Sequence, residues 1–480
     1  MSQENQTSEM LSRGENVLAI VGGTIIDASG RSPIIDGVVL IKGDRLHAVG
    51  SRELVIPENV EQLTAHGKYI IPGLMDANVH LLGDIRLENL LRYYGRWREL
   101  VVEAAQMALK AGLTTVFDTW GPRTHLMEVR DSIERGEVVG SRIFCAGNII
   151  GLDGPFSLDF SAKAAEVASK EIVELINAQW VENVGPGLTW YTPERVAEEV
   201  RTYISQGINF VKYASSEHRW GDPTTSLIFS TRTQAAIVKE AHRAHITAQA
   251  HASSVESLKA AIDAGCDIVQ HCNITGPTPI PGETLDALAN RRTGAVVFPF
   301  TQRRFEWIMK ECPVDRVYFS TSDDNCKNLI KAQAMLMLAS DACVLAPEIA
   351  SDPALGRSWL APGDDNLAEL GQGHFHWLRA MEEKGLPAID GLRAATHNIA
   401  VAYGMERDFG TIEEGKLADL LILEKDPLKS AENYRSIATI IKGGRIVEHR
   451  NLPTHPILSR REKDPAALKL LSRYRPHRHF

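Results

Sequence analysis

The chain has 480 residues, of which 44% are hydrophobic and 24% are charged, and its formal net charge is −9. These values are typical of a globular protein and exclude a disordered or collagen-like chain. A mildly acidic chain is also a poor candidate for binding nucleic acid over its whole surface. No stretch approaches the roughly 18–20 uninterrupted apolar residues of a membrane helix, so we expect no membrane partner.

The N-terminal segment and the cysteines point to a cytoplasmic protein. Residues 1–15 are polar and lack the apolar core of a signal peptide. None of the six cysteines forms a Cys-x-x-Cys pair, so the sequence predicts neither a disulfide framework nor a zinc knuckle. We therefore expect a soluble, reduced protein of the cytoplasm.

Both ends of the chain are rich in β-branched residues. The first predicted strand contains Gly22-Gly23, where we expect a turn, and the second segment is predicted to be a hairpin that turns at 42–45. The predicted β segments near the two ends are 17–26, 37–50, 68–71, 418–423 and 436–447. Two β-rich ends that flank a different middle suggest one small domain assembled from both termini.

The middle of the chain alternates strand-like and helix-like segments. The predicted strands are 114–118, 141–146, 210–213, 247–250, 268–271 and 295–298. The segment 253–264, between two of them, has apolar residues near helical spacing and stops at Gly265. This alternation indicates an α/β fold of parallel βαβ units, and about eight units over roughly 330 residues predict a (β/α)₈ TIM barrel. A doubly wound open sheet is the competing architecture.

These patterns predict a division of the chain into domains. Residues 1–72 and 404–455 would form a composite β-sandwich, and residues 73–403 would form the barrel. The segment 456–480 is rich in Lys and Arg. We interpret it as a solvated tail or as an arm that clasps another subunit, in preference to a nucleic-acid arm.

Residues of types that can bind metals fall at the ends of predicted strands. They are Asn78, His80, Lys212, His251, His271 and Asp341. In a parallel barrel the carboxyl ends of all strands open on the same face, so these residues would converge although they are far apart in the sequence. Asn78 and His80 are two residues apart on one strand, so their side chains would point the same way. The sequence therefore predicts a metal centre at this face.

The donor types indicate which ion would bind. Imidazole and carboxylate ligands suit zinc, cobalt, iron or manganese. An ammonium group has no lone pair to give, so Lys212 makes sense as a ligand only if CO₂ converts its amine to a carbamate, which requires burial to keep the amine neutral. Taken singly, each residue is better explained as a core histidine, a barrel lysine or a helix cap. The joint arrangement in barrel order favours the metal site.

Several segments resemble the metal-dependent amidohydrolase superfamily. Residues 70–80 are similar to that family's "PGxxDxHxH" entry into the barrel, and 112–116 resembles its second strand. Residues 394–400 and 410–421 resemble the stretch that leads back into its β-sandwich. The resemblance implies a (β/α)₈ barrel with a composite β-sandwich and a homo-oligomer. It also implies that His80, His251, His271 and carboxylated Lys212 hold the metal.

The chain departs from the family at its entry motif. The family has His-x-His, whereas this chain has Asn78-x-His80. A neutral amide oxygen is a weaker ligand than imidazole, so the number of bound metal ions, one or two, remains open. Asn-x-His is similar to the subgroup of phenylurea hydrolases and molinate (thiocarbamate) hydrolase. His374-Phe-His376 also has the His-x-His spacing, but a helical context would point the two rings in different directions.

The resemblance implies hydrolysis of a urea C–N bond. A divalent metal, zinc for preference, would activate water, and Asp341 would take up its proton and later deliver it to the leaving nitrogen. A diuron-like phenylurea would yield an aniline, CO₂ and a dialkylamine. A small neutral aromatic substrate requires an apolar pocket. Candidate aromatic residues near the strand ends are Trp120, Phe156, Phe160, Trp220, Phe298 and Phe300.

Two other hypotheses remain open at this stage. The same chemistry could act on a thiocarbamate, an N-acyl amino acid or a dipeptide, and the last two would require a cation for the substrate carboxylate. Arg219, Arg303 and Arg304 could provide it. The chain could also be a barrel that has lost catalysis and serves as a binding protein, which only the substitution at Asn78 supports.

Overall fold

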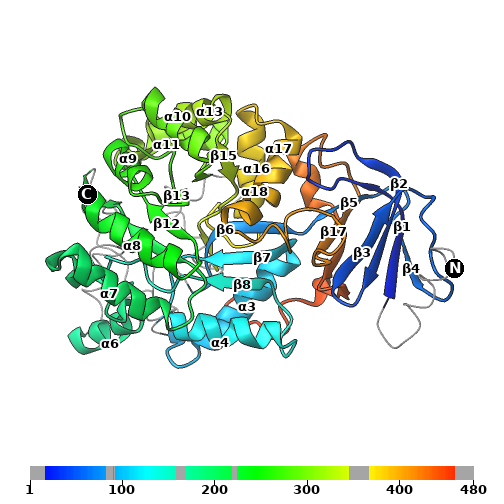
Figure 1. The fold of residues 1–480 in the computed structure, drawn as a ribbon, viewed down its shortest axis with the longest axis horizontal. Coiled ribbons are helices and arrows are strands. Elements are labelled where there is room, and N and C mark those ends of the chain that lie inside the picture. The colour runs from blue at the N-terminus through cyan, green and yellow to red at the C-terminus, as the bar shows by residue number, and fades with distance from the viewer. Residues whose placement is uncertain are drawn as a thin grey trace.

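The computed structural model describes residues 17–82, 90, 92–157, 160, 169–218, 224–344 and 367–459. Arg219, Trp220 and residues from 460 onwards, which include most of the predicted basic tail, lie outside the described residues. Figure 1 shows a large β-sheet at one end of the molecule and a body of parallel strands flanked by helices at the other.

The large sheet combines strands from both ends of the chain. Its strands are β1 (Val17–Ile25), β2 (Ile34–Lys42), β3 (Arg45–Gly50), β4 (Glu61–Thr64), β5 (Tyr69–Pro72), β17 (Leu420–Leu423), β18 (Ile437–Lys442) and β19 (Arg445–Val447). Their order is β19-β18-β17-β5-β1-β2-β3, and β4 pairs with β1. The join between the two ends is the antiparallel pair of β5 with β17, in which Pro72 lies opposite Leu420.

Alternation along β1 gives this sheet two apolar faces. Leu18 and Ile20 belong to one buried cluster, whereas Ala19 packs on the opposite face with Val38 and Leu40. Successive side chains of a strand point to opposite faces, so one strand contributes to both clusters. The central strands β1 and β2 are therefore buried on both faces over part of their length, whereas the edge strands β4 and β19 are largely exposed.

The predicted turn at Gly22-Gly23 is wrong. β1 continues through both glycines, and its pairing with β2 shifts register around Gly23. Gly22 has a φ of +81°, and a Cβ at this position would lie 2.0 Å from the His66 ring. Glycine thus allows a bulge and a close approach within the strand, where the sequence pattern suggested a reversal. The hairpin predicted to turn at 42–45 is confirmed by β2 and β3.

The parallel strands form two sheets. One has the order β16-β6-β7-β8 and the other β15-β14-β13-β12-β9, and all of their pairs are parallel. The strands are β6 (Leu74–His80), β7 (Leu113–Asp118), β8 (Arg142–Cys145), β9 (Val211–Ala214), β12 (Ala248–His251), β13 (Ile268–Gln270), β14 (Gly294–Val296), β15 (Met335–Met337) and β16 (Ala342–Cys343). A short hairpin, β10 (Ser216–His218) and β11 (Thr225–Leu227), follows β9.

Helices alternate with these strands, as the sequence predicts. They are α3 (Trp97–Lys110), α4 (Arg123–Glu134), α6 (Lys170–Val181), α7 (Pro193–Ile204), α8 (Thr231–Arg243), α9 (Val255–Asp263), α10 (Gly282–Arg291), α11 (Gln302–Glu311), α12 (Asp315–Phe319), α13 (Ser322–Lys331), α16 (Gly373–Glu383), α17 (Ala388–Ala394) and α18 (His397–Ala402). Within the described ranges, none of them combines the length and the apolar composition that crossing a bilayer requires.

Backbone hydrogen bonds link the two parallel sheets on both sides. After β8, the N–H of Ile150 donates to the Lys212 carbonyl at 2.9 Å, and the N–H of Ala214 donates to the Ile150 carbonyl at 3.0 Å. On the other side, the N–H of Ala77 in β6 donates to the carbonyl of Leu338, just after β15, at 3.0 Å. The carboxyl ends of strands from both sheets therefore lie on a common face.

Helix α9 illustrates how local sequence positions this face. Ser254 and Ser257 form a reciprocal capping box that starts the helix three residues after His251. Leu258, Ala261 and Ile262 are its buried apolar residues. A capping box satisfies backbone N–H groups that would otherwise lack partners, so it fixes where the helix begins. The loop between β12 and α9 is therefore short and well defined.

Candidate metal centre

Five of the six predicted site residues lie toward the carboxyl ends of parallel strands or directly after them, and the sixth, Asp341, lies between β15 and β16. Asn78 and His80 belong to β6, Lys212 to β9 and His251 to β12. The other two, His271 and Asp341, directly follow β13 and precede β16, respectively. The rings of His251 and His271 lie 5.0 Å apart between centroids. The charge of Asp341 acts on Lys212, and those of His80 and His271 act on Asp341.

Asp341 faces His80 across the join between the sheets. Nε2 of His80 lies 3.0 Å from Oδ1 of Asp341. The Asp341 carboxyl is partly buried, which by itself would raise its pKa, but the charges of His271, His80 and Lys212 outweigh this effect and hold the pKa well below the usual range. Asp341 is therefore an ionised carboxylate at neutral pH, able to bind a cation.

Lys212 is buried among these groups. Only 2% of its surface is exposed, and Nζ donates a hydrogen bond to Oγ1 of Thr119 at 3.0 Å. Burial lowers the pKa of Lys212 to about 8, although the charges of Asp341, Glu217 and Asp118 oppose the shift. About one amine in ten is then neutral at pH 7. The environment of Lys212 therefore fits the neutral amine that reaction with CO₂ requires.

Asn78 is held by hydrogen bonds at both ends of its amide. Its Oδ1 accepts a hydrogen bond from the Thr119 hydroxyl, and its Nδ2 donates to Oε1 of Gln270 at 3.2 Å. Gln270 donates in turn to Gln249, whose Nε2 donates to the Tyr403 hydroxyl at 2.9 Å. The sequence pattern did not indicate this buried amide network. Oδ1 of Asn78 keeps a second lone pair, so its role as a metal ligand stays a prediction.

Two acidic residues that we did not include among the candidates also lie at this face. Glu217, in β10, has Oε2 at 3.4 Å from Nε2 of His251. Asp118 ends β7, and burial raises its pKa to about 7, against the opposing influence chiefly of the His80 charge. Asp118 could have been found as the acid at the end of a predicted strand. Glu217 carries no such signal, because it lies in a hairpin that the sequence pattern did not indicate.

The donor types suit a divalent cation, but the described side chains do not surround a single point in coordination geometry. Within the described ranges, no three His, Cys, Asp or Glu side chains are arranged as a metal site. The donors occur instead as two pairs, His80 with Asp341 and His251 with Glu217. Nδ1 of His80 is buried and makes no hydrogen bond in the described part of the chain. Imidazole and carboxylate donors are among the ligands that zinc prefers.

The other His-x-His pair lies elsewhere. His374 and His376 are buried in α16, as the expected helical context requires. Nε2 of His374 lies 3.1 Å from the carbonyl oxygen of Ala111. Burial lowers the pKa of both histidines to about 3, so both are neutral structural residues at physiological pH.

Aromatic rings lie on both sides of the candidate centre. The Trp120 ring lies 5.7 Å from the ring of His80, edge to face, and Phe160 stacks on Trp120 at 4.0 Å. On the other side, Phe298 lies 6.3 Å from His271. These contacts give the centre apolar walls, which raise the strength of electrostatic interactions by excluding water.

The other predicted candidates within the described residues are Phe156, Phe300, Arg303 and Arg304. Phe156 is buried in the core, and Phe300 packs against Phe298 at 5.5 Å. Arg304 is fully buried in α11, whereas Arg303 is exposed on the same helix. Neither arginine lines the cavity beside the loops that follow β12 and β13.

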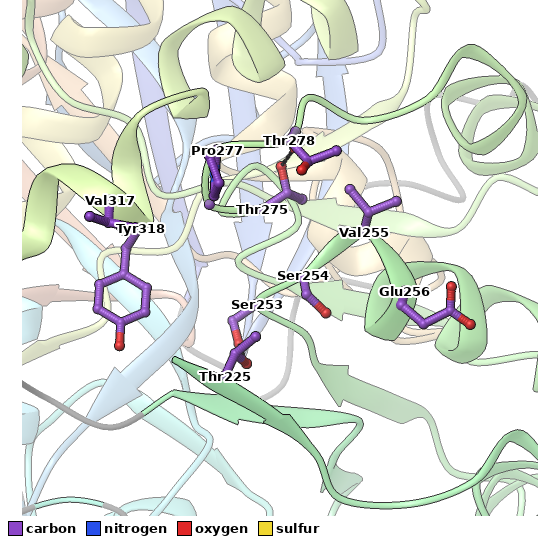
Figure 2. Close-up of a pocket in the computed structure, with 11 residues that line it drawn as sticks. Thr225, Ser253, Ser254, Val255, Glu256, Thr275, Pro277, Thr278, Val317 and Tyr318 are labelled. Atoms are coloured by element: carbon purple, nitrogen blue, oxygen red, sulfur yellow. Dashed lines mark hydrogen bonds between the residues drawn. The ribbon is translucent and has the colours of Figure 1, made fainter. Parts of the chain in front are cut away.

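A cavity of about 310 Å³ opens beside the loops that follow β12 and β13. Its lining residues are Thr225, Ser253, Ser254, Val255, Glu256, Thr275, Gly276, Pro277, Thr278, Val317 and Tyr318. Figure 2 shows hydroxyl groups from the two loops and the hairpin around this space, with Tyr318 at one side. Among the described residues that line it, none is a cation that would neutralise a carboxylate. Such a volume is in the range of small-molecule sites.

The chain belongs to the amidohydrolase family, whose sequence profile matches residues 69–447. Members of this family generally use a divalent metal. The solved structure of molinate hydrolase is similar, with 34% identity, a TM-score of 0.88 and coverage of 94% of this chain and 99% of that one. Phenylurea hydrolase B is similar at 31% identity and a TM-score of 0.87, with 93% of this chain and 100% of that one covered.

A curated relative supports the same assignment. Ochratoxinase from Aspergillus niger is 24% identical over 447 residues, which cover 90% of this chain and 86% of the relative. Together with the family match, these relatives identify the chain as a hydrolase that acts on C–N bonds. The resemblance inferred from the entry and closing motifs is confirmed.

Proposed function

We propose that this protein is a metal-dependent hydrolase that cleaves the urea C–N bond of phenylureas. The products would be an aniline, CO₂ and a dialkylamine. The observation that carries the proposal is the convergence of His80, Asp341 and buried Lys212, since Nε2 of His80 lies 3.0 Å from Asp341 and the charge of Asp341 acts on Lys212. We assign His251 and His271, whose rings lie 5.0 Å apart, to the same centre.

The proposal includes a closed (β/α)₈ barrel. The hydrogen bonds of Ile150 with the β9 strand and of Ala77 with Leu338 support closure, because they join the two parallel sheets at both sides. Closure would place the ligands of β6, β9, β12 and β13 around one opening. We also retain the proposed division into a composite β-sandwich at 1–72 and 404–455, a barrel at 73–403 and a basic tail at 456–480.

Each ligand has a defined task in this proposal. The divalent metal, for which we propose zinc, supplies a Lewis acid that activates water and the substrate carbonyl. The neutral amine of Lys212 adds CO₂ and loses one proton to become a carbamate, an anionic ligand. Asp341 accepts a proton from the attacking water and delivers it to the leaving nitrogen, which departs as the amine. Asn78 would contribute a weak neutral ligand.

The surroundings favour a neutral aromatic substrate. Trp120 and Phe298 flank the centre and give it apolar walls that would suit an aryl group. The lining of the 310 Å³ cavity contains hydroxyl groups and no cation among the described residues. A dipeptide or an N-acyl amino acid carries a carboxylate that such a lining does not neutralise. We therefore favour hydrolysis of a urea over hydrolysis of a peptide-type substrate and over a purely binding role.

A thiocarbamate is the second candidate substrate. Molinate hydrolase is 34% identical to this chain, and phenylurea hydrolase B is 31% identical. Both substrate types present a carbonyl between two heteroatoms, so the same centre would serve either. The aromatic rings beside His80 and His271 favour the aryl-bearing phenylurea.

The test is a comparison of four substrates with the zinc-reconstituted protein. A phenylurea, a thiocarbamate, an anilide and a dipeptide would be incubated at equal concentration, and the released amine would be measured. We expect the phenylurea to be hydrolysed fastest, with one or two equivalents of metal per chain. Preference for the dipeptide, or a protein that purifies without stoichiometric metal and stays inactive with zinc, would reject the proposal.

Two further properties belong to this proposal. We propose a cytoplasmic homo-oligomer, and all six cysteines are buried thiols, which a reducing compartment would keep reduced. Light scattering of the purified protein would show more than one subunit per particle, whereas a monomer at working concentration would reject the oligomer.

A further inference from the structure

Glu217 lies beside His251 in a buried environment. Oε2 of Glu217 is 3.4 Å from Nε2 of His251, and each side chain is only 8% exposed. A buried carboxylate needs polar partners in place of water, so its closeness to a ring nitrogen restricts the positions of both side chains. The pair is therefore a defined feature of the site.

The backbone around the two residues is tied together on both sides of the pair. The N–H of Ser215 donates to the His251 carbonyl at 2.9 Å. The N–H of Ser253 donates to Oγ of Ser216 at 2.9 Å. The segment that carries Glu217 and the loop that follows His251 are thus joined by two hydrogen bonds, which fix the relative position of carboxylate and ring.

The hairpin itself holds Glu217 in register. Glu217 pairs with Ser226 in the antiparallel ladder of β10 and β11. The hydroxyl of Thr225 donates to the Glu217 carbonyl at 3.0 Å. Successive residues of a strand point to opposite faces, so this register keeps the Glu217 side chain on the face where it meets His251.

We propose that Glu217 is a positioning residue of the metal centre, which accepts the Nε2–H of His251 and so presents Nδ1 of that ring to the metal. Histidines that bind metals usually donate their other ring N–H to a carboxylate or carbonyl, which fixes the tautomer and the ring orientation. The separation of 3.4 Å needs only a small rotation to reach hydrogen-bond length. This inference rests on the metal centre proposed above.

The first test compares Glu217→Gln with Glu240→Gln. Glu240, in α8, is also buried and ion-paired, at 2.8 Å from Arg201, but lies on the outer helix layer. Zinc dissociation constants would be measured by competition with a chelator, and melting of the metal-free proteins would report on the fold. We expect Glu217→Gln to weaken zinc binding by about 10- to 100-fold, and Glu240→Gln to change it by less than about twofold. Equal zinc affinities in the two variants would overturn the inference.

The second test is made on the wild-type chain and does not require a Glu217 variant to fold. Nitrogen-15 NMR of the zinc-loaded protein distinguishes the two ring nitrogens of His251, whose signals would be assigned with His251→Asn. We expect zinc on Nδ1 and a proton on Nε2. Zinc on Nε2, or Glu217 bound directly to the metal, would overturn the positioning role. A wild type that binds no metal would reject the proposed function instead, so the two failures are distinguishable.

Discussion

Asp341 is anchored to the strand that carries His80, although the two residues are 261 positions apart. The backbone N–H of Asp341 donates to the carbonyl of Asn78 at 2.8 Å, and Nε2 of His80 lies 3.0 Å from Oδ1 of Asp341. Asp341 has a φ of +55°, a left-handed conformation in which Asp is enriched. One strand, β6, therefore sets the position of both the imidazole and the acid.

Replacing Asp341 by asparagine should abolish turnover. An amide cannot accept the proton of the attacking water, so we expect a loss of about 10²- to 10⁴-fold in kcat. Some metal should remain, since the histidines and Lys212 are retained. Amine release and metal content per chain would be measured on the same sample. A variant with wild-type kcat would contradict the assignment of Asp341 as base.

Lys212→Arg should lose metal and activity together. A guanidinium stays protonated and cannot form a carbamate, and it would add a permanent charge beside Thr119. We expect metal content to fall by about tenfold or more. Lys239→Arg, an exposed substitution on α8, is the matched control and should leave both values unchanged. An active Lys212→Arg enzyme would show that no carbamate is needed.

Asn78→His should strengthen metal retention while it weakens the metal-free fold. The imidazole is a better ligand than the amide oxygen, so we expect metal loss to a chelator to slow by about tenfold. The substitution also removes the partners of Thr119 and Gln270, which should cost about 1–3 kcal/mol. Chelator kinetics and thermal melting without metal would measure the two effects. Unchanged metal retention would indicate that the residue at this position is not a ligand.

The buried histidines of α16 should make the fold sensitive to acid. Burial lowers the pKa of His374 and His376 to about 3, whereas an unfolded histidine titrates near 6.5. Between these values the unfolded state binds more protons, so stability is full above pH 6.5 and is lost as pH falls toward 3. Each histidine should contribute a slope of about 1.4 kcal/mol per pH unit in this window.

A variant isolates one of these contributions. His374→Gln keeps a donor for the Ala111 carbonyl but removes the titrating ring. Denaturant unfolding between pH 4 and 7 should show a shallower loss of stability than in the wild type. The control is His242→Gln, since the His242 side chain is 47% exposed. Identical slopes in the wild type and His374→Gln would refute the explanation.

The amino-acid sequence by itself determined the order of the parallel strands and the residues at their carboxyl ends. The segments predicted at 114–118, 247–250 and 268–271 correspond closely to β7, β12 and β13. Apolar periodicity and chain order are local properties, and in parallel units they assign each strand end to one face. The candidate metal ligands could therefore be chosen from the sequence alone, namely His80, Lys212, His251, His271 and Asp341. The helical setting of His374 and His376 could be predicted in the same way.

Only the tertiary structure decided how those strand ends are supported. The bond from Asn78 to Gln270 joins residues 192 positions apart, and Glu217 meets His251 because a hairpin that the pattern did not indicate is tied to the β12 loop. Likewise, the bulge at Gly22 depends on the approach of His66. Such contacts depend on the register between distant strands and on side-chain rotamers, neither of which leaves a periodic signal in the chain.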